Sequence, residues 1–116
     1  MSRLVLTVRE EENISIVELV GDVDAHTAMQ MESALEKLVG EKKYNIIVNC
    51  KGLKYISSAG LGVFMAFIEI VRKNQGDIKL SNVPPRAYHI IDLFGFPTLI
   101  EIFKEEREAI EKFRNI

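Results

Sequence analysis

Residues 44–73 read YNIIVNCKGLKYISSAGLGVFMAFIEIVRK and join two different patterns. The first, Tyr44 to Cys50, is almost continuously apolar, which is typical of a strand covered on both faces of a sheet. The second, Leu61 to Val71, has apolar residues at helical spacing, and it is followed by basic residues and a glycine that favour a helix end. A buried strand that passes into such a helix predicts an α/β fold.

The flanking segments extend this pattern over the whole chain. Residues 4–9 and 14–20 have strand-like apolar patterns across a short acidic turn, which predicts an antiparallel hairpin. Residues 28–39 have one apolar helical face, which Gly40 ends. The other predicted elements are a strand at 78–80, a helix at 85–94, a strand at 99–103 and an amphipathic helix from Lys104. We expect one domain, residues 1–116, with a mixed sheet of about five strands covered by about four helices.

Composition excludes several classes of protein. The chain has 116 residues, 47% of them hydrophobic, which suffices for one core without disulfides or metal. Its 15 Lys and Arg and 17 Asp and Glu leave a net charge of -2, unlike a protein that binds nucleic acid or an anionic membrane. The single cysteine excludes an internal disulfide framework and a multi-cysteine metal site. No apolar run approaches the roughly 18 residues of a membrane span. We therefore expect a cytoplasmic protein without metal or cofactor.

The passage from the buried strand to the helix breaks the usual rules of helix design. Gly60 and Gly62 fall in its first turns, where each glycine costs about 1 kcal/mol relative to alanine. Ser57 and Ser58 precede them and are typical N-cap residues. One interpretation is a cap followed by tolerated glycines. The other is an exposed, modifiable hydroxyl at a helix N-terminus, where the helix dipole would favour a phosphate. A dinucleotide-binding fingerprint is excluded because its third glycine is replaced by Met65.

Two further expectations concern helix capping and packing. Thr27 and Gln30 have the spacing of a capping box, and Asp24 is a competing helix start. Met65 is expected to pack in the core, together with Phe67 and Ile68, as apolar residues of a helix usually do.

Two segments carry a family resemblance, GDVDAHT at 21–27 and LKYISSAGLG at 53–62. In this order they resemble the anti-sigma factor antagonist family, which has the STAS fold, and the resemblance covers essentially the whole chain. It implies a binding protein rather than an enzyme. An unphosphorylated antagonist binds an anti-sigma factor, which is also a serine kinase, and so frees a sigma factor. The kinase ends the interaction by phosphorylating the antagonist, and a serine phosphatase reverses the modification.

The resemblance also implies which residues act. Aligned on Gly60-Leu61-Gly62, the phosphorylated serine of the family falls on Ser58, with Ser57 as the second choice. Many members have Asp where this chain has Ser57, and Ser or Thr where it has Ala59. The implied partner-binding residues are Asp24, Thr27, Ser57, Ser58, Ala59, Gly60, Leu61 and Gly62. The free protein is expected to be a monomer.

Two alternatives remain open at this point. The chain could be a related scaffold or small-ligand sensor in which Ser58 is never modified. It could also be a small hydrolase that uses Ser58 or Cys50 as nucleophile with His26 or His89 as base. The place of Cys50 at the end of an apolar strand favours burial instead.

Overall fold

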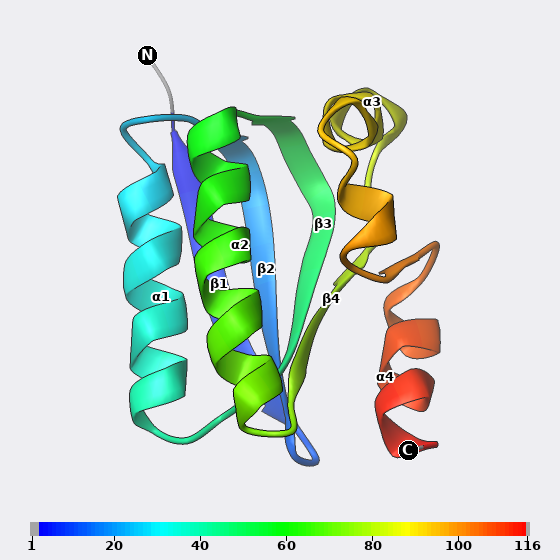
Figure 1. The fold of residues 1–116 in the computed structure, drawn as a ribbon. Coiled ribbons are helices and arrows are strands. Elements are labelled where there is room, and N and C mark those ends of the chain that lie inside the picture. Colours follow the sequence, from blue (N-terminus) through cyan, green and yellow to red (C-terminus); the bar gives the residue numbers. More distant parts are fainter. Residues whose placement is uncertain (1–2, 116) are drawn as a thin grey trace.

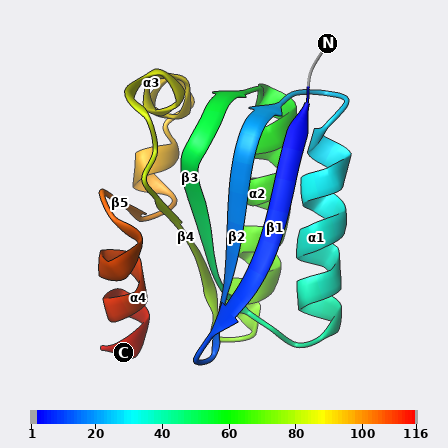
Figure 2. The same ribbon diagram turned by 180° about the vertical axis from the view of Figure 1, so that it is seen from behind.

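The computed structural model describes residues 3–115 and shows a five-stranded sheet with helices against both faces (Figures 1 and 2). The strands are β1 (Leu4–Glu11), β2 (Ile14–Val23), β3 (Asn45–Ile56), β4 (Asp77–Ser81) and β5 (Ile102–Phe103). The helices are α1 (Ala28–Gly40), α2 (Ser58–Lys73), α3 (Pro85–Leu93) and α4 (Glu106–Arg114), with a short 3-10 helix, η1, at Phe96–Thr98. The predicted fold class is confirmed.

The sheet order is β1-β2-β3-β4-β5, so neighbours in sequence are neighbours in space. β1 and β2 are antiparallel, whereas β2 to β5 run parallel and are joined by crossover segments that contain α1, α2 and α3. Parallel strands end at the same edge of a sheet. Val23 at the end of β2 therefore pairs with Ile56 at the end of β3, and α1 and α2 start side by side at the top of Figure 1.

Two apolar clusters explain the continuous apolar pattern of β3. Ile46 and Val48 point into the larger cluster, beneath α1 and α2. Ile47 points to the other face, where it packs with β2 and α4. The residues of this smaller cluster are Ile14, Ile16, Ile47, Ala109 and Ile110. β3 is therefore covered on both faces along this stretch, as its sequence predicts.

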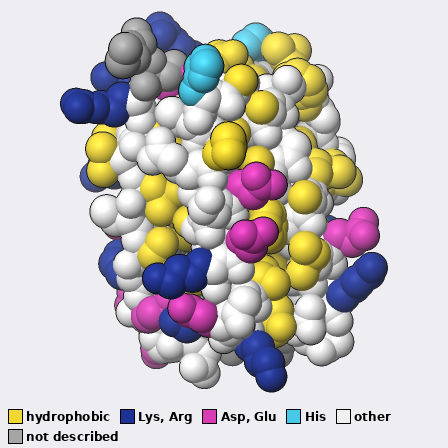
Figure 3. All heavy atoms as spheres, turned by 90° about the vertical axis from the view of Figure 1, so that its left-hand side faces the viewer, with side chains coloured by type: hydrophobic (Ala, Val, Ile, Leu, Met, Phe, Trp, Pro, Cys, Tyr) yellow, Lys and Arg dark blue, Asp and Glu magenta, His cyan; other side chains and the backbone are white. Residues whose placement is uncertain are grey.

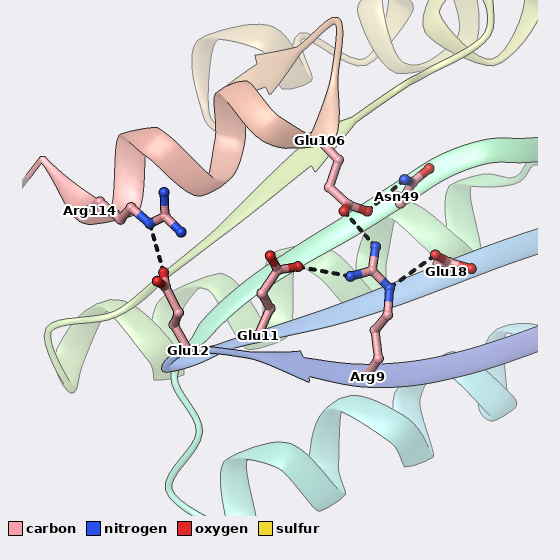
Figure 4. A network of polar contacts seen from close by, with 7 residues as sticks. All are labelled: Arg9, Glu11, Glu12, Glu18, Asn49, Glu106 and Arg114. Atoms are coloured by element: carbon pink, nitrogen blue, oxygen red, sulfur yellow. Dashed lines mark hydrogen bonds and ion pairs between the residues drawn. The ribbon is translucent and has the colours of Figure 1, made fainter.

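Polar contacts also fasten α4 to the sheet (Figure 4). The Arg9 guanidinium on β1 pairs with Glu106 at the start of α4, and the Asn49 amide donates to the same carboxylate at 2.9 Å. At the other end of α4, Arg114 donates to Glu12 at 2.7 Å. These contacts hold α4 on the face of the sheet opposite α1 and α2 (Figure 2).

The observed elements differ from the predicted ones mainly at their ends. α2 begins at Ser58 rather than Leu61, because the helix accommodates both glycines. β3 continues to Ile56, where its ladder with β2 ends. The predicted strand 99–103 shortens to Ile102–Phe103, because Gly95 at φ 72° turns the chain into η1. No helix within residues 3–115 is long and apolar enough to cross a membrane.

Candidate functional site

The start of α2 presents two serines in different states. Ser57 is the N-cap in extended conformation, and its hydroxyl accepts from the Gly60 N–H at 3.4 Å, which confirms the predicted cap. Its own N–H donates to the Val23 carbonyl at 2.8 Å and ties α2 to the end of β2. Ser57 is half-buried, whereas Ser58, the first helical residue, is exposed. Within residues 3–115 the Ser58 hydroxyl makes no hydrogen bond to another side chain.

The adjacent turn between β2 and α1 is closed by its own hydrogen bonds. The Asp24 carboxylate accepts from the backbone N–H groups of His26 and Thr27 at 2.9 and 3.0 Å. The buried Thr27 hydroxyl donates to the Asp22 carbonyl at 2.7 Å and accepts from the Asp24 N–H at 2.9 Å. The backbone N–H of Thr27, followed by that of His26, holds the pKa of the Asp24 carboxyl below its ordinary value, against the opposing effect of desolvation. Asp24 is therefore a carboxylate at neutral pH.

The predicted capping box of Thr27 and Gln30 is wrong. Thr27 precedes α1 but makes no side-chain cap bond to it, because its hydroxyl is engaged with Asp22 and Asp24. The Gln30 amide instead donates to the Leu4 carbonyl of β1 at 3.2 Å. Asp24, the competing start, supplies the acceptor for the free N–H groups of the turn before α1.

The two glycines of α2 serve different purposes. A methyl group on Gly60 would stand 2.6 Å from Val23 Cγ1 and 2.9 Å from Ile56 Cγ1, so only glycine fits there without movement. A methyl group on Gly62 would have no neighbour within 4 Å. The packing of the described residues therefore requires Gly60 and leaves Gly62 unexplained. A glycine at the surface leaves room for another backbone to approach closely.

The exposed face of α2 is uncharged over its first three turns. The residues that form it from Ser58 onward are Ser58, Ala59, Gly62, Met65 and Ala66, and the first charge is at Glu69. Met65, expected in the core, is 47% exposed, because the core face of α2 passes through Leu61, Phe64, Ile68 and Val71. On α1, Met29 is 68% exposed. Figure 3, seen from the α1 side, shows hydrophobic side chains at the surface in both the upper and the lower half of this face.

The structure brings the eight predicted partner-binding residues together at one end of the sheet. Three of them are exposed: Ser58, Ala59 and Gly62. Asp24 and Ser57 are half-buried, and Thr27, Gly60 and Leu61 are buried. Because Thr27, Gly60 and Leu61 are buried, they support the exposed residues from below and do not form the surface themselves. Sequence reasoning did not predict that Met29 and Met65 are exposed. The signal for Met65 was its place seven residues after Ser58, on the same helical face.

The geometry gives no support to the hydrolase alternative. Cys50 is fully buried, and desolvation raises the pKa of its thiol to about 12, so it does not form a nucleophilic thiolate at neutral pH. His26 and His89 are both exposed, and within residues 3–115 neither imidazole is hydrogen-bonded to Ser57 or Ser58. Among these residues no cluster of three or more His, Cys, Asp or Glu could hold a metal ion.

Known proteins share both the sequence pattern and the fold. A family model described as STAS domain matches residues 6–109. The anti-sigma-B factor antagonist of Bacillus subtilis (strain 168) is 28% identical over 104 residues, which are 90% of this chain and 94% of that protein. An anti-sigma factor antagonist from Mycobacterium paratuberculosis superimposes with a TM-score of 0.89 at 20% identity, covering 97% of this chain and 95% of that one.

SpoIIAA, an anti-sigma factor antagonist from Bacillus, has been solved in two forms with the same fold. The unphosphorylated form has a TM-score of 0.84 at 20% identity and covers 97% of this chain and 98% of SpoIIAA. The phosphorylated form has a TM-score of 0.73 at 19% identity and covers 94% and 99%.

Proposed function

This chain belongs to the STAS domain family, and we propose that it is an anti-sigma factor antagonist switched by phosphorylation of Ser58. The name of its Bacillus subtilis relative supports the first part of the proposal. The observation that carries the second part is the exposed Ser58 hydroxyl, free of side-chain partners, on the first residue of α2. The existence of a phosphorylated form of SpoIIAA, which has the same fold, is consistent with it.

Ser58 is the better acceptor of the two serines. The Ser57 hydroxyl is half-buried and already accepts from Gly60, so its modification would cost α2 its cap. A phosphate on Ser58 would lie at the N-terminus of a 16-residue helix, where free N–H groups and the helix dipole favour an anion. The fold would therefore tolerate the modification.

The same phosphate would change recognition strongly. It adds a charge of about −1.5 to −2 to a surface of small uncharged residues. The Asp24 carboxylate in the adjacent turn is also ionised. A partner that packs on Ser58, Ala59 and Gly62 would have to bury the phosphate dianion, at a cost of several kcal/mol if it stays unpaired. Because about 1.4 kcal/mol is tenfold in affinity, binding would fall by orders of magnitude without refolding.

The partner in this proposal is an anti-sigma factor that is also a serine kinase, and a serine phosphatase restores the binding form. The protein acts as a cytoplasmic monomer whose binding surface carries the signal, and it does so without catalysis. Direct docking on nucleic acid is not part of the proposal, because a net charge of -2 does not favour binding to a polyanion.

The test is reconstitution with a candidate anti-sigma kinase and ATP, followed by mass spectrometry and a binding titration. We expect one phosphate on Ser58, loss of binding on phosphorylation, weak binding by Ser58→Asp, and binding by Ser58→Ala that ATP does not abolish. Ser57→Ala is the matched control and should still be phosphorylated. If Ser58→Asp binds as the wild type does and no serine is modified, the chain is an unmodified scaffold instead.

A further inference from the structure

An open groove of about 410 Å³ lies beside the exposed face of α2, beyond the Ser58 site. Its lining residues are Met65, Ile68, Glu69, Arg72, Lys73 and Leu99. Ile68, 6% exposed, forms an apolar floor. Met65 on α2 and Leu99 after η1 stand on opposite sides, 47% and 42% exposed. Large apolar side chains that gather at an open surface mark a contact site more often than they occur by chance.

The groove is preformed because a basic side chain fixes its far wall. Arg72 Nε donates to Asp77 Oδ1 at 2.9 Å, and its Nη2 donates to the Leu99 carbonyl at 2.7 Å. Arg72 therefore ties the segment after η1 to the end of α2 and sets the separation of Met65 and Leu99. A preformed site avoids the cost of ordering its walls when a ligand binds.

The groove and Ser58 lie on one stripe of α2. Ser58, Gly62, Met65, Glu69 and Arg72 follow each other at alternating intervals of four and three residues, which places them in line on one face of the helix. The stripe is uncharged from Ser58 through Met65. At the groove it carries two cations, of which Arg72 is paired with Asp77 at 2.9 Å and Lys73 is paired loosely with Glu69 at 3.7 Å. Gly62, which no neighbour within the described chain requires, lies on the stripe between Ser58 and Met65.

We propose that the groove is a second docking site for the same anti-sigma kinase that meets Ser58. This inference rests on the proposed function. The occupant is an amphipathic helix of the kinase that lies along the stripe, passes Gly62 at close approach and inserts an apolar side chain between Met65 and Leu99. An acidic residue of that helix meets Lys73, whose side chain is 75% exposed and paired only loosely with Glu69, at 3.7 Å.

Continuity with the Ser58 surface and the open shape of the groove favour this occupant over a small ligand. The groove is open along the stripe, so it would leave much of a small molecule in water, whereas ligand pockets usually bury most of their ligand. A side chain projected from a facing helix needs no such enclosure. Hydrophobic anchors that enter a pocket commonly supply most of the affinity of an interface.

The test is a binding titration of unphosphorylated variants against the candidate kinase. Met65→Glu and Leu99→Glu each place a carboxylate in the groove and should weaken binding at least about tenfold. Ile70→Glu is the matched control, because Ile70 is 39% exposed on the same helix but does not line the groove. It should bind within about threefold of the wild type. Lys73→Glu should weaken binding and reduce its dependence on salt.

The outcomes separate this inference from the function on which it rests. If Ser58→Asp abolishes binding while Met65→Glu and Leu99→Glu bind as the wild type does, the groove is not a contact and the Ser58 switch stands. If the wild type does not bind the kinase, both fail. If the wild type self-associates in sedimentation and Met65→Glu abolishes this, the occupant is a second copy and the inference is overturned. Circular dichroism should show all variants folded, because every substituted side chain is exposed.

Discussion

The starts of α1 and α2 lie side by side but differ in how they use their polar groups. Each follows a parallel strand, and Val23 and Ile56, the last residues of those strands, pair with each other. At the α1 start the polar side chains are hydrogen-bonded to the local backbone. The buried Thr27 hydroxyl bonds two backbone atoms, and the Asp24 carboxylate bonds two more. The α2 start leaves the Ser58 hydroxyl exposed. One turn is built to hold position, and the other is built to present a group.

The same contrast recurs within α2, two residues apart. Gly60 is required by the packing of Val23 and Ile56, whereas a methyl group added at Gly62 would meet no neighbour within 4 Å. A helix can therefore carry one glycine for its own fold and another that only a partner would explain. Substitutions in the two turns and at the two glycines test whether these positions differ in this way.

Thr27→Val should have the largest effect on stability. It keeps the shape of the side chain but leaves the Asp24 N–H and the Asp22 carbonyl without their hydroxyl partner. We expect a loss of about 3 kcal/mol in the free energy of unfolding, since each unpaired group costs roughly 1–3 kcal/mol. Urea denaturation measures it, and Thr27→Ser is the control that keeps the hydroxyl. A loss no greater than that of Thr27→Ser would show that the turn does not depend on these bonds.

Gly60→Ala should be the next most damaging change. The added methyl group would stand 2.6 Å from Val23 Cγ1, and both Val23 and Ile56 are β-branched side chains that cannot swing away easily. Overpacking of this kind costs about 1–3 kcal/mol, which outweighs the gain in helix propensity. Thermal unfolding followed by circular dichroism would record a lower melting temperature. An unchanged melting temperature would contradict the structural role of Gly60.

Gly62→Ala should act in the opposite direction. The site is open, so the alanine gains helix propensity without a clash and stabilises the protein by about 0.5–1 kcal/mol. Binding to the kinase partner should weaken at the same time, since the methyl group occupies the space of close approach. The same glycine-to-alanine change should therefore destabilise the protein at position 60 and stabilise it at position 62. Stabilisation without weaker binding would remove Gly62 from the proposed interface.

The sequence was sufficient for the fold class and for the N-cap, because both depend on local patterns. Apolar spacing located β3 and most of α2, and Ser57 caps α2 as predicted. The sequence could not indicate the roles of the two glycines. These roles depend on the presence or absence of contacts with Val23 and Ile56, which lie on two different strands. The capping box failed for the same reason.

Parts of the candidate site that depend on long-range contacts could not be predicted from the sequence. The Gln30 amide found its acceptor in β1, at Leu4, which no local rule could indicate. Met65 was assigned to the core by its apolar character alone. Its exposure follows from the register of α2 on the sheet, and the groove beside it depends on Leu99, 34 positions further along the chain.

Ser57→Ala should have a smaller effect than any of the preceding substitutions. The bond that it removes, from the Gly60 N–H to the Ser57 hydroxyl, is long at 3.4 Å. Loss of a serine cap costs about 0.5–2 kcal/mol, and we expect the low end, about 0.5 kcal/mol, in urea denaturation. Ser58→Ala is the control and should change stability less, because its hydroxyl has no side-chain partner. A larger loss for Ser58→Ala would reverse the assignment of cap and acceptor.

The smallest expected effect is the pH dependence that Asp24 contributes. Backbone N–H groups lower the pKa of its carboxyl in the folded state, so the unfolded chain binds the proton more readily. The stabilisation is therefore complete above the unfolded pKa, about 3.9, and it is lost as the pH falls through the lower folded pKa. Asp24→Asn removes this titration. The urea midpoint of the wild type should exceed that of Asp24→Asn at pH 7, and the difference should shrink at acidic pH. A difference that stays constant with pH would mean that folding does not lower the pKa of the Asp24 carboxyl.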